Sequence, residues 1–405
     1  MLISYLWWLF SFDLDFFVSG INFFAIVNVM SSPLQINTSG DRKSILESIM
    51  ALARDNHVTD IHIPHTGICY MRRSNVLEPV MNALTGEPFE IFEAEFTKIL
   101  GSFKFERYQP LSKRLTFGDV QLRALYISAN QLKGVFDELL ILRVQPLTPP
   151  VLSDFIENAT VKSALLDPHG LILVTGMIGS GKTSLASSVC ASWVSEGRHI
   201  FTVEDPIEYY LTSDRGRVTQ LSANLVASDV SFESAALLAL RADIDGLFIG
   251  ECRNAATFRV CLDAATTHEP CITTLHSGGF ADALTRALSF AQQTMPAGVA
   301  EFALSQALHS IVHVSLAYGE DGMPIPMVAV LPFWSSDKVR KMLIESCTSP
   351  VAMLDHIRHI LRDGDMPGVV GYDAAAEVAR LKGATEDSIR RAKAYSPELP
   401  SYLQD

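Results

Sequence analysis

The stretch "LILVTGMIGSGKTSLASSV", residues 171–189, decides the fold. Gly176, four further residues and then Gly181-Lys182-Thr183 make the eight-residue pattern of a phosphate-binding loop. An apolar, strand-like run precedes this loop and a helix-like run follows it, which is the context that the pattern requires. The loop N–H groups and the positive end of the helix would then face phosphate oxygens. The stretch predicts a nucleotide site rather than a tight turn with an exposed lysine.

The predicted loop also assigns contacts to the nucleotide. Lys182 is expected to reach the β- and γ-phosphates, and Thr183 is expected to bind Mg²⁺. The remaining contacts are expected from the rest of the loop and the first helical turn: Gly176, Met177, Ile178, Gly179, Ser180, Gly181 and Ser184. The cofactors that follow from this stretch are ATP and Mg²⁺.

The composition indicates a folded protein of two or three domains, because the chain has 405 residues, of which 48% are hydrophobic and 19% charged. A net charge of −13, with no dense basic run, argues against broad binding of nucleic acid. The six cysteines are scattered without a CxxC pair, which is typical of reduced cytoplasmic thiols. His62 and His65 lie in an alternating, strand-like stretch, which we interpret as structural rather than as a metal pair.

The first thirty residues are very apolar, but Asp13 and Asp15 interrupt them. Neither half reaches the roughly 20 apolar residues of a membrane-spanning helix. A signal peptide would need a basic start, and no Lys or Arg precedes Arg42. Residues 1–29 are therefore interpreted as a leader translated from a mis-assigned start codon upstream of Met30, with a membrane-contacting segment or a poorly ordered appendage as the alternatives.

The rest of the chain divides by pattern. Short strand-like runs with interspersed helical stretches predict a small α+β domain over residues 30–144. The segment "QPLTPPVLSD", 145–154, contains three prolines and is expected to be an extended linker. Alternating helices and doubly apolar strands predict a covered parallel sheet over 155–345. Residues 346–405 are mostly helix-like.

Three further strand-like stretches end in polar residues that suit nucleotide chemistry. "FTVEDPIEY", 201–209, contains Glu204; "GLFIGE", 246–251, ends in Glu251; and "CITTLHS", 271–277, contains His276. Ligands of open α/β sheets bind beyond the carboxyl ends of the strands. We therefore expect these three side chains to gather beside Lys182, with Glu204 helping to hold Mg²⁺ or the attacking water.

These stretches together resemble the secretion ATPases of type II secretion, type IV pili and type IV secretion. "TVEDPIEY" is similar to the family's acidic box, "GLFIGE" to its Walker B motif with glycine in place of aspartate, and "ATTHEPCITTLHS" to its histidine box. The resemblance covers about residues 40–400. It implies a RecA-like ATPase domain, a small PAS-like domain before it, and assembly into a homohexamer.

The resemblance also implies roles for single residues. Glu251 would polarise the attacking water, and His268 and His276 would be the two box histidines, with His276 sensing the γ-phosphate. Arg123 and Arg143 match positions from which the family supplies arginines to the phosphates of a neighbouring subunit. Arg241, before the Walker B strand, is a further candidate for that role, while Arg253 flanks the strand and Arg114 is weaker.

The chain departs from the family pattern at three positions. Ile244 stands where the family has proline, Thr267 where it has glycine before the first box histidine, and Lys133 where it has arginine. A lysine cannot offer the bidentate fork of an arginine, so the contact expected from position 133 is weakened.

Within the family, "IGECRNAATFRVCLDAATTHEPCITTLHSGG" resembles the DotB and TraJ ATPases of type IVB secretion and conjugation. This implies a peripheral motor on the cytoplasmic side of the inner membrane that acts on a membrane-embedded complex, with or without a second ATPase, and that binds no nucleic acid itself. Residues 357–362 instead resemble pilus-retraction ATPases, which is the alternative machine. An ATP-binding assembly scaffold with negligible hydrolysis and a helicase are the alternatives from other classes.

Overall fold

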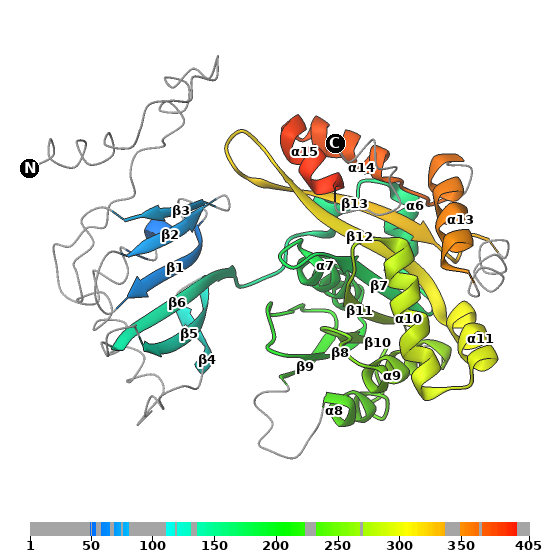
Figure 1. The fold of residues 1–405 in the computed structure, drawn as a ribbon. Coiled ribbons are helices and arrows are strands. Elements are labelled where there is room, and N and C mark those ends of the chain that lie inside the picture. The colour runs from blue at the N-terminus through cyan, green and yellow to red at the C-terminus, as the bar shows by residue number, and fades with distance from the viewer. Residues whose placement is uncertain are drawn as a thin grey trace, which may run out of the picture.

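The computed structural model describes residues 49, 51–53, 58–64, 69–73, 76–80, 111–117, 120–130, 136–222, 232–267, 270–336, 349–363 and 367–394. Two sheets form along the chain, each with its own set of strands (Figure 1). The predicted leader, residues 1–29, and the box residue His268 lie outside the described residues.

The N-terminal sheet is antiparallel and has the strand order β3-β2-β1-β6-β5-β4. Its strands are β1 (Val58–Pro64), β2 (Tyr70–Arg73), β3 (Val76–Pro79), β4 (Leu111–Phe117), β5 (Val120–Asn130) and β6 (Phe136–Pro146). Buried residues alternate with more exposed ones over 61–64 of β1 and 139–143 of β6, as expected where one face packs and the other meets solvent. Ile61, Ile63 and Leu142 are each at most 1% exposed. The helical residues 51–53 complete the small α+β unit that the sequence predicts.

The second sheet has the order β13-β12-β7-β11-β10-β8-β9. Its strands are β7 (Leu171–Gly176), β8 (His199–Glu204), β9 (Arg217–Ser222), β10 (Gly246–Ile249), β11 (Cys271–His276), β12 (Leu308–Tyr318) and β13 (Pro324–Pro332). All neighbouring pairs are parallel except β12 and β13. The predicted parallel sheet is therefore confirmed, with one antiparallel strand at its edge.

Helices cover both faces of this sheet, and strand β7 shows why. Leu171 and Leu173 belong to one apolar core, while Ile172 and Val174 belong to the other. The first core includes residues of α8 (Phe232–Ala239), α9 (Ala255–Thr266), α10 (Phe280–Thr294), α11 (Ala297–Ala307) and α13 (Pro350–Asp363). The second includes residues of α5 (Leu152–Phe155), α6 (Ala159–Leu166) and α7 (Lys182–Ser195). A strand that is apolar on both faces requires this double cover.

The described residues of the C-terminal part, 349–363 and 367–394, are mainly helical, as predicted. Helices α14 (Tyr372–Leu381) and α15 (Glu386–Lys393) pack on the β12–β13 hairpin, where Ala379 and Ile389 share a core with Ala317 and Met327. The fold is thus a RecA-like α/β domain preceded by a small α+β unit and followed by helices. Strand β6 ends at Pro146 and α5 begins at Leu152, so residues 147–151 connect these two elements, and the predicted linker 145–154 also includes the end of β6 and most of the short helix α5.

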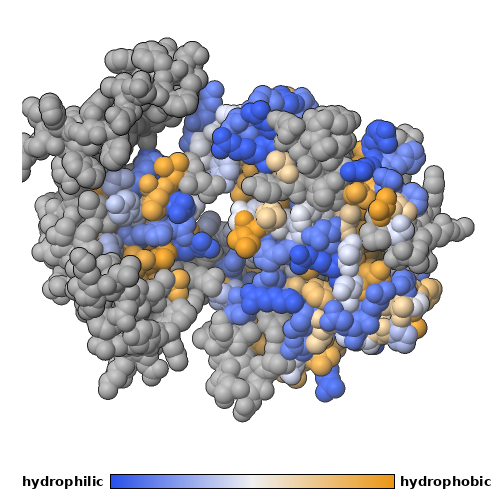
Figure 2. Space-filling model, in the orientation of Figure 1, coloured by the Kyte–Doolittle hydropathy of each residue, from blue (hydrophilic) through white to orange (hydrophobic). Residues whose placement is uncertain are grey.

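No helix in the described ranges is long and apolar enough to cross a bilayer. On the face drawn in Figure 2, apolar side chains form small separate groups among hydrophilic ones rather than a continuous band.

Candidate nucleotide site

The predicted phosphate loop lies between β7 and α7, at the carboxyl edge of the parallel strands. Gly176 must be glycine, because a Cβ there would lie 2.2 Å from the Val314 carbonyl oxygen and 2.5 Å from Ser180 Oγ. Its φ of +144° also lies in the region that favours glycine. The loop can therefore curl tightly in front of the helix, which is what a phosphate cradle requires.

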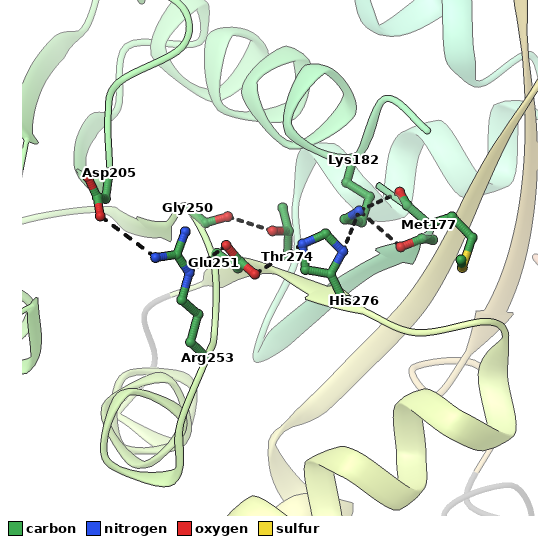
Figure 3. Close-up of polar contacts among 9 residues, drawn as sticks. Met177, Lys182, Asp205, Gly250, Glu251, Arg253, Thr274 and His276 are labelled. Atoms are coloured by element: carbon green, nitrogen blue, oxygen red, sulfur yellow. Dashed lines mark hydrogen bonds and ion pairs between the residues drawn. The ribbon is translucent and has the colours of Figure 1, made fainter. Parts of the chain in front are cut away.

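Lys182 begins α7 and is only 6% exposed. Its Nζ donates to the carbonyl oxygens of Gly176 at 2.9 Å and Met177 at 2.7 Å, and it lies 3.2 Å from His276 Nδ1 (Figure 3). Burial lowers the pKa of Lys182 to about 8, although the nearby Glu251 carboxylate opposes this shift. The ammonium group thus has few solvent contacts to lose when it turns toward a phosphate.

Nucleotide affinity should fall as pH rises through the Lys182 pKa of about 8. The free protein loses this proton above that pH, whereas phosphate oxygens in the complex favour the charged form. Nucleotide binding measured by calorimetry should be about eightfold weaker at pH 9 than at pH 7.5. Lys182→Arg keeps its charge and is the control. An equal pH dependence in Lys182→Arg would show that another group titrates.

His276 connects Lys182 to the Walker B glutamate. Burial, followed by the Lys182 charge, lowers the pKa of His276, so the ring is neutral at pH 7. If Lys182 donates to Nδ1, the ring proton is on Nε2, which lies 3.1 Å from Glu251 Oε1. The imidazole of His276 therefore links the charged amine of Lys182 to the carboxylate of Glu251.

The polar chain continues beyond Glu251. Arg253 Nε donates to Glu251 Oε2 at 2.7 Å, and Arg253 Nη1 lies 3.7 Å from Asp205 Oδ2 (Figure 3). The side chain of Arg253 is 62% exposed, so this ion pair is open to solvent and to incoming groups. The structure brings Glu251 and His276 together with Lys182 as predicted, whereas the carboxyl group of Glu204, expected in the same cluster, is hydrogen-bonded to Thr202, Gln220 and the Glu208 N–H instead.

Glu204 is 2% exposed and lies beside Gly250. Its Oε1 accepts from Thr202 Oγ1 at 2.7 Å and from Gln220 Nε2 at 3.3 Å, and its Oε2 from the Glu208 N–H at 3.4 Å. Burial raises the pKa of Glu204 to about 7. A Cβ at Gly250 would meet Glu204 Cα and Cγ at 3.3 Å, so the glycine of this Walker B motif leaves room for the carboxyl group from β8.

The residues present fit a nucleotide with Mg²⁺. Within the part of the chain that the structure describes, the hydroxyl of Ser180 is buried inside the loop without a hydrogen-bond partner. Thr183 follows Lys182 at the start of α7. The described residues contain no group of three or more His, Cys, Asp or Glu that could hold a metal by themselves.

The candidate arginines lie on the N-terminal sheet in one row across the strands. The register pairs Arg114 with Arg123, Arg123 with Arg143, and Arg143 with Asp60. Residues directly opposite in antiparallel strands lie on the same face. Arg143 Nε donates to Asp60 Oδ1 at 2.9 Å, and the same register pairs Asp60 with Arg72 on β2. The backbone register therefore places four arginines and the buried Asp60 in one row across the sheet.

Arg241 is not part of this arrangement or of the Lys182 cluster. It is exposed in the turn after α8, where its N–H donates to the Leu238 carbonyl. Strand β10 begins at Gly246 and ends beside Glu251, so Arg241 lies at the opposite end of the strand from that glutamate.

Some residues of the site had no motif of their own. Gln220 on β9 binds both Glu204 and the Tyr209 carbonyl, and Asp60 pairs with Arg143 from 83 residues away. Tyr209, which ends the acidic-box stretch, lies with its hydroxyl 2.7 Å from Ser184 Oγ. For Asp60, the sequence offered one hint of a functional role, a carboxylate at the polar start of an alternating strand. For Gln220, no neighbouring residue indicated a role in the site.

Comparisons with known proteins show which family and which solved structures this chain is similar to. Residues 153–318 match the family described as "Type II/IV secretion system protein". The uncharacterized protein YggR of Escherichia coli K12 is 38% identical over 148 residues, which are 36% of this chain and 45% of YggR. The chain thus aligns with less than half of that relative.

Two solved structures share the fold. The Legionella pneumophila ATPase DotB matches 89% of this chain and 98% of its own with a TM-score of 0.73 and 19% identity. The pilus retraction motor PilT with bound ADP matches 81% and 95%, with a TM-score of 0.63 and 23% identity. The chain therefore shares the RecA-like α/β fold of these two ATPases.

Residues 153–318 carry the domain described for type II and type IV secretion system proteins, and the fold of the chain is near that of DotB. The resemblance read from the motifs is confirmed at this level.

Proposed function

We propose that this chain is the ATP-hydrolysing subunit of a homohexameric motor in a type IVB secretion or conjugative transfer apparatus. The observation that carries the proposal is the continuous contact from Lys182 through His276 to Glu251 at the mouth of a phosphate loop. A binding scaffold needs the loop and its lysine. A glutamate held in position by a histidine next to the phosphate loop is needed only for hydrolysis.

The proposed roles follow from the contacts. Mg²⁺, held by Thr183 with Glu204 as a carboxylate partner, would supply charge neutralisation to the phosphates. Lys182 would leave the carbonyls of Gly176 and Met177 for phosphate oxygens. His276, losing Lys182 as its partner, would keep Nε2–H on Glu251, so that Glu251 is oriented as the group that accepts a proton from water. His268 is retained as a box histidine on the resemblance alone.

The arginine row supports the assembly. The register places Arg114, Arg123 and Arg143 opposite one another on neighbouring strands, and guanidinium groups suit phosphate charge. We propose that Arg123 and Arg143 of one subunit complete the site of the next, as the resemblance implies, with Asp60 holding Arg143 in place. Arg241 keeps only a role toward a neighbouring subunit, because within its own chain it lies at the far end of β10 from Glu251.

Mixing two inactive variants should restore ATP hydrolysis if each nucleotide site is built from residues of two neighbouring subunits. Arg143→Gln, which keeps a donor for Asp60, lacks the guanidinium given to the neighbour, and Lys182→Ala lacks the subunit's own phosphate contact. In an equal mixture about a quarter of the sites should be whole, so phosphate release should approach a quarter of the wild-type rate.

The control for this experiment is Arg390→Ala on the exposed end of α15, which should be fully active alone. Nucleotide binding by isolated Arg143→Gln subunits should be nearly unchanged. A mixture no more active than its components would refute completion by a neighbour, as would full activity of a monomer by light scattering.

The direct test of the proposed activity is steady-state phosphate release by the purified chain with ATP and Mg²⁺. Turnover that stops when Mg²⁺ is chelated supports a motor. Tight ATP binding without turnover would favour the assembly scaffold. Stimulation by single-stranded DNA would favour the helicase, which the net charge of −13 opposes.

The organisation and partners belong to the same proposal. We propose a leader at 1–29, domains over 30–144 and 155–345 joined by the linker 145–154, and a helical segment over 346–405. The motor would act at the cytoplasmic face of the inner membrane, on a membrane-embedded complex and through a second ATPase where one is present. The PilT fold match keeps pilus retraction as the second candidate.

A chain starting at Met30 should reach membranes only when the rest of the transfer apparatus is expressed. Membrane binding by this chain in the absence of the apparatus would contradict the proposal.

A further inference from the structure

The acidic-box loop, residues 205–211, contacts three parts of the molecule that are distant in sequence. It follows Glu204 at the end of β8 and leads toward β9. Its side chains and main chain reach helix α7, strand β9 and the connecting segment 147–151. No role beyond carboxylate chemistry follows from its sequence, so these contacts need their own explanation.

The first contact is between Tyr209 and the phosphate-loop helix. Tyr209 is 8% exposed, and its hydroxyl lies 2.7 Å from Ser184 Oγ. Ser184 is the third residue of α7, two positions after Lys182. Burial raises the pKa of Tyr209, so its hydroxyl stays protonated and able to donate at neutral pH. The helix end that would meet the nucleotide is thereby joined to the acidic-box loop.

The second contact fixes the loop to Glu204. The side-chain amide of Gln220 donates to the Tyr209 carbonyl at 2.9 Å and lies 3.3 Å from Glu204 Oε1. Its carbonyl oxygen accepts from the Leu211 N–H at 3.0 Å. The side chain of Gln220 therefore binds the main chain on both sides of Tyr210 and fixes the loop next to the buried carboxyl group of Glu204.

The third contact reaches the segment between the two sheets. The Tyr210 N–H donates to the Leu147 carbonyl at 2.9 Å, immediately after β6 ends. The Ser188 hydroxyl, one turn further along α7 from Ser184, lies 2.7 Å from the Pro150 carbonyl. The connecting segment is thus attached to the phosphate-loop helix directly and, through Tyr209 and Tyr210, by way of the acidic-box loop.

We infer that Tyr209 is a positioning residue that couples the phosphate-loop helix to the connecting segment 147–151 and so to the N-terminal sheet. A shift of the first turn of α7 on nucleotide binding would move Ser184, Tyr209 and the Tyr210–Leu147 bond together. This inference rests on the proposed nucleotide binding. It adds the route by which the site would act on the arginine-bearing sheet.

The test is Tyr209→Phe in the full chain, which removes the hydroxyl and keeps the ring. Hydrogen exchange of single amides is measured with and without ADP. In the wild type, ADP should slow exchange of the Tyr210 amide at least about threefold, because its bond to Leu147 is strengthened. In Tyr209→Phe this response should disappear. The Leu211 amide, which is bonded to Gln220 and not to the hydroxyl route, should stay protected.

The rate of ATP hydrolysis provides a second, independent test of the inference. Tyr209→Phe should lower kcat about three- to tenfold, the range for one buried hydrogen bond, with KM changed less than about twofold. Ser184→Ala removes the same bond from the other side, so the double variant should be no slower than the slower single variant.

Three results would overturn the inference: an unchanged ADP response at Tyr210 in Tyr209→Phe, additive losses in the double variant, or equal loss of protection at Tyr210 and Leu211, which would indicate a merely loosened loop. A wild-type chain that bound ADP without hydrolysing ATP would defeat the proposed motor and leave this exchange experiment valid. A wild-type chain that bound no nucleotide would overturn both.

Discussion

Lys182→Ala is expected to abolish ATP hydrolysis, with a fall of at least about a thousandfold, and to weaken nucleotide binding about 10- to 100-fold. The change removes the cation beside the phosphate loop, whose Nζ would exchange the Gly176 and Met177 carbonyls for phosphate oxygens. It also removes the donor to His276 Nδ1 and with it the contact that leads to Glu251. The loss should therefore be larger in kcat/KM than in affinity alone.

Phosphate release and calorimetry with ADP measure the two effects separately. Lys162→Ala on α6 removes a lysine from a helix that does not reach the site and should leave both values unchanged. Because Lys182 is buried with a lowered pKa, its removal should not cost folding stability, and thermal unfolding should confirm this. Hydrolysis by Lys182→Ala at a rate near wild type would mean that the loop is not the phosphate site.

Glu251→Gln should reduce turnover by at least about a hundredfold and should trap ATP in the site. The amide fills the same space, but its single oxygen can accept from only one of the two donors, His276 Nε2–H and Arg253 Nε–H, so one of these contacts is lost together with the charge. What it loses is the carboxylate that would accept the proton from the attacking water. Affinity for ATP should be equal to or tighter than in the wild type.

The measurement is single-turnover hydrolysis together with the amount of ATP retained after rapid gel filtration. Glu196→Gln, an exposed glutamate at the end of α7, is the matched control and should behave like the wild type. Wild-type turnover in Glu251→Gln would move the role of general base to another group, with Glu204 as the first alternative because burial raises its pKa to about 7.

Both variants rest on features that the sequence predicted. The phosphate loop is a contiguous pattern whose glycines are required by local backbone geometry, so Gly176 to Ser184 could be assigned without a fold. The strand ends that carry Glu204, Glu251 and His276 were also predictable, because parallel strands share one carboxyl edge. The helical C-terminal part followed from its periodicity, and α13 to α15 confirm it.

Only the tertiary structure decided which partners these residues have. That Gly250 makes space for Glu204 depends on β8 lying next to β10, although β9 and α8 come between them in the chain. The row of Arg114, Arg123 and Arg143 depends on the register of three antiparallel strands, and a slip of one residue would place them on opposite faces.

The contacts around the acidic box show the same difference between what the sequence determined and what only the tertiary structure determined. The sequence by itself determined the class of site, because chemistry at a phosphate demands particular residue types within short motifs. It did not determine that Tyr209 meets Ser184, that Gln220 holds Glu204, or that Asp60 holds Arg143 across 83 residues. Strand order, register and side-chain packing bring those atoms together, and these arise from burying both faces of one sheet and one face of the other rather than from any local pattern.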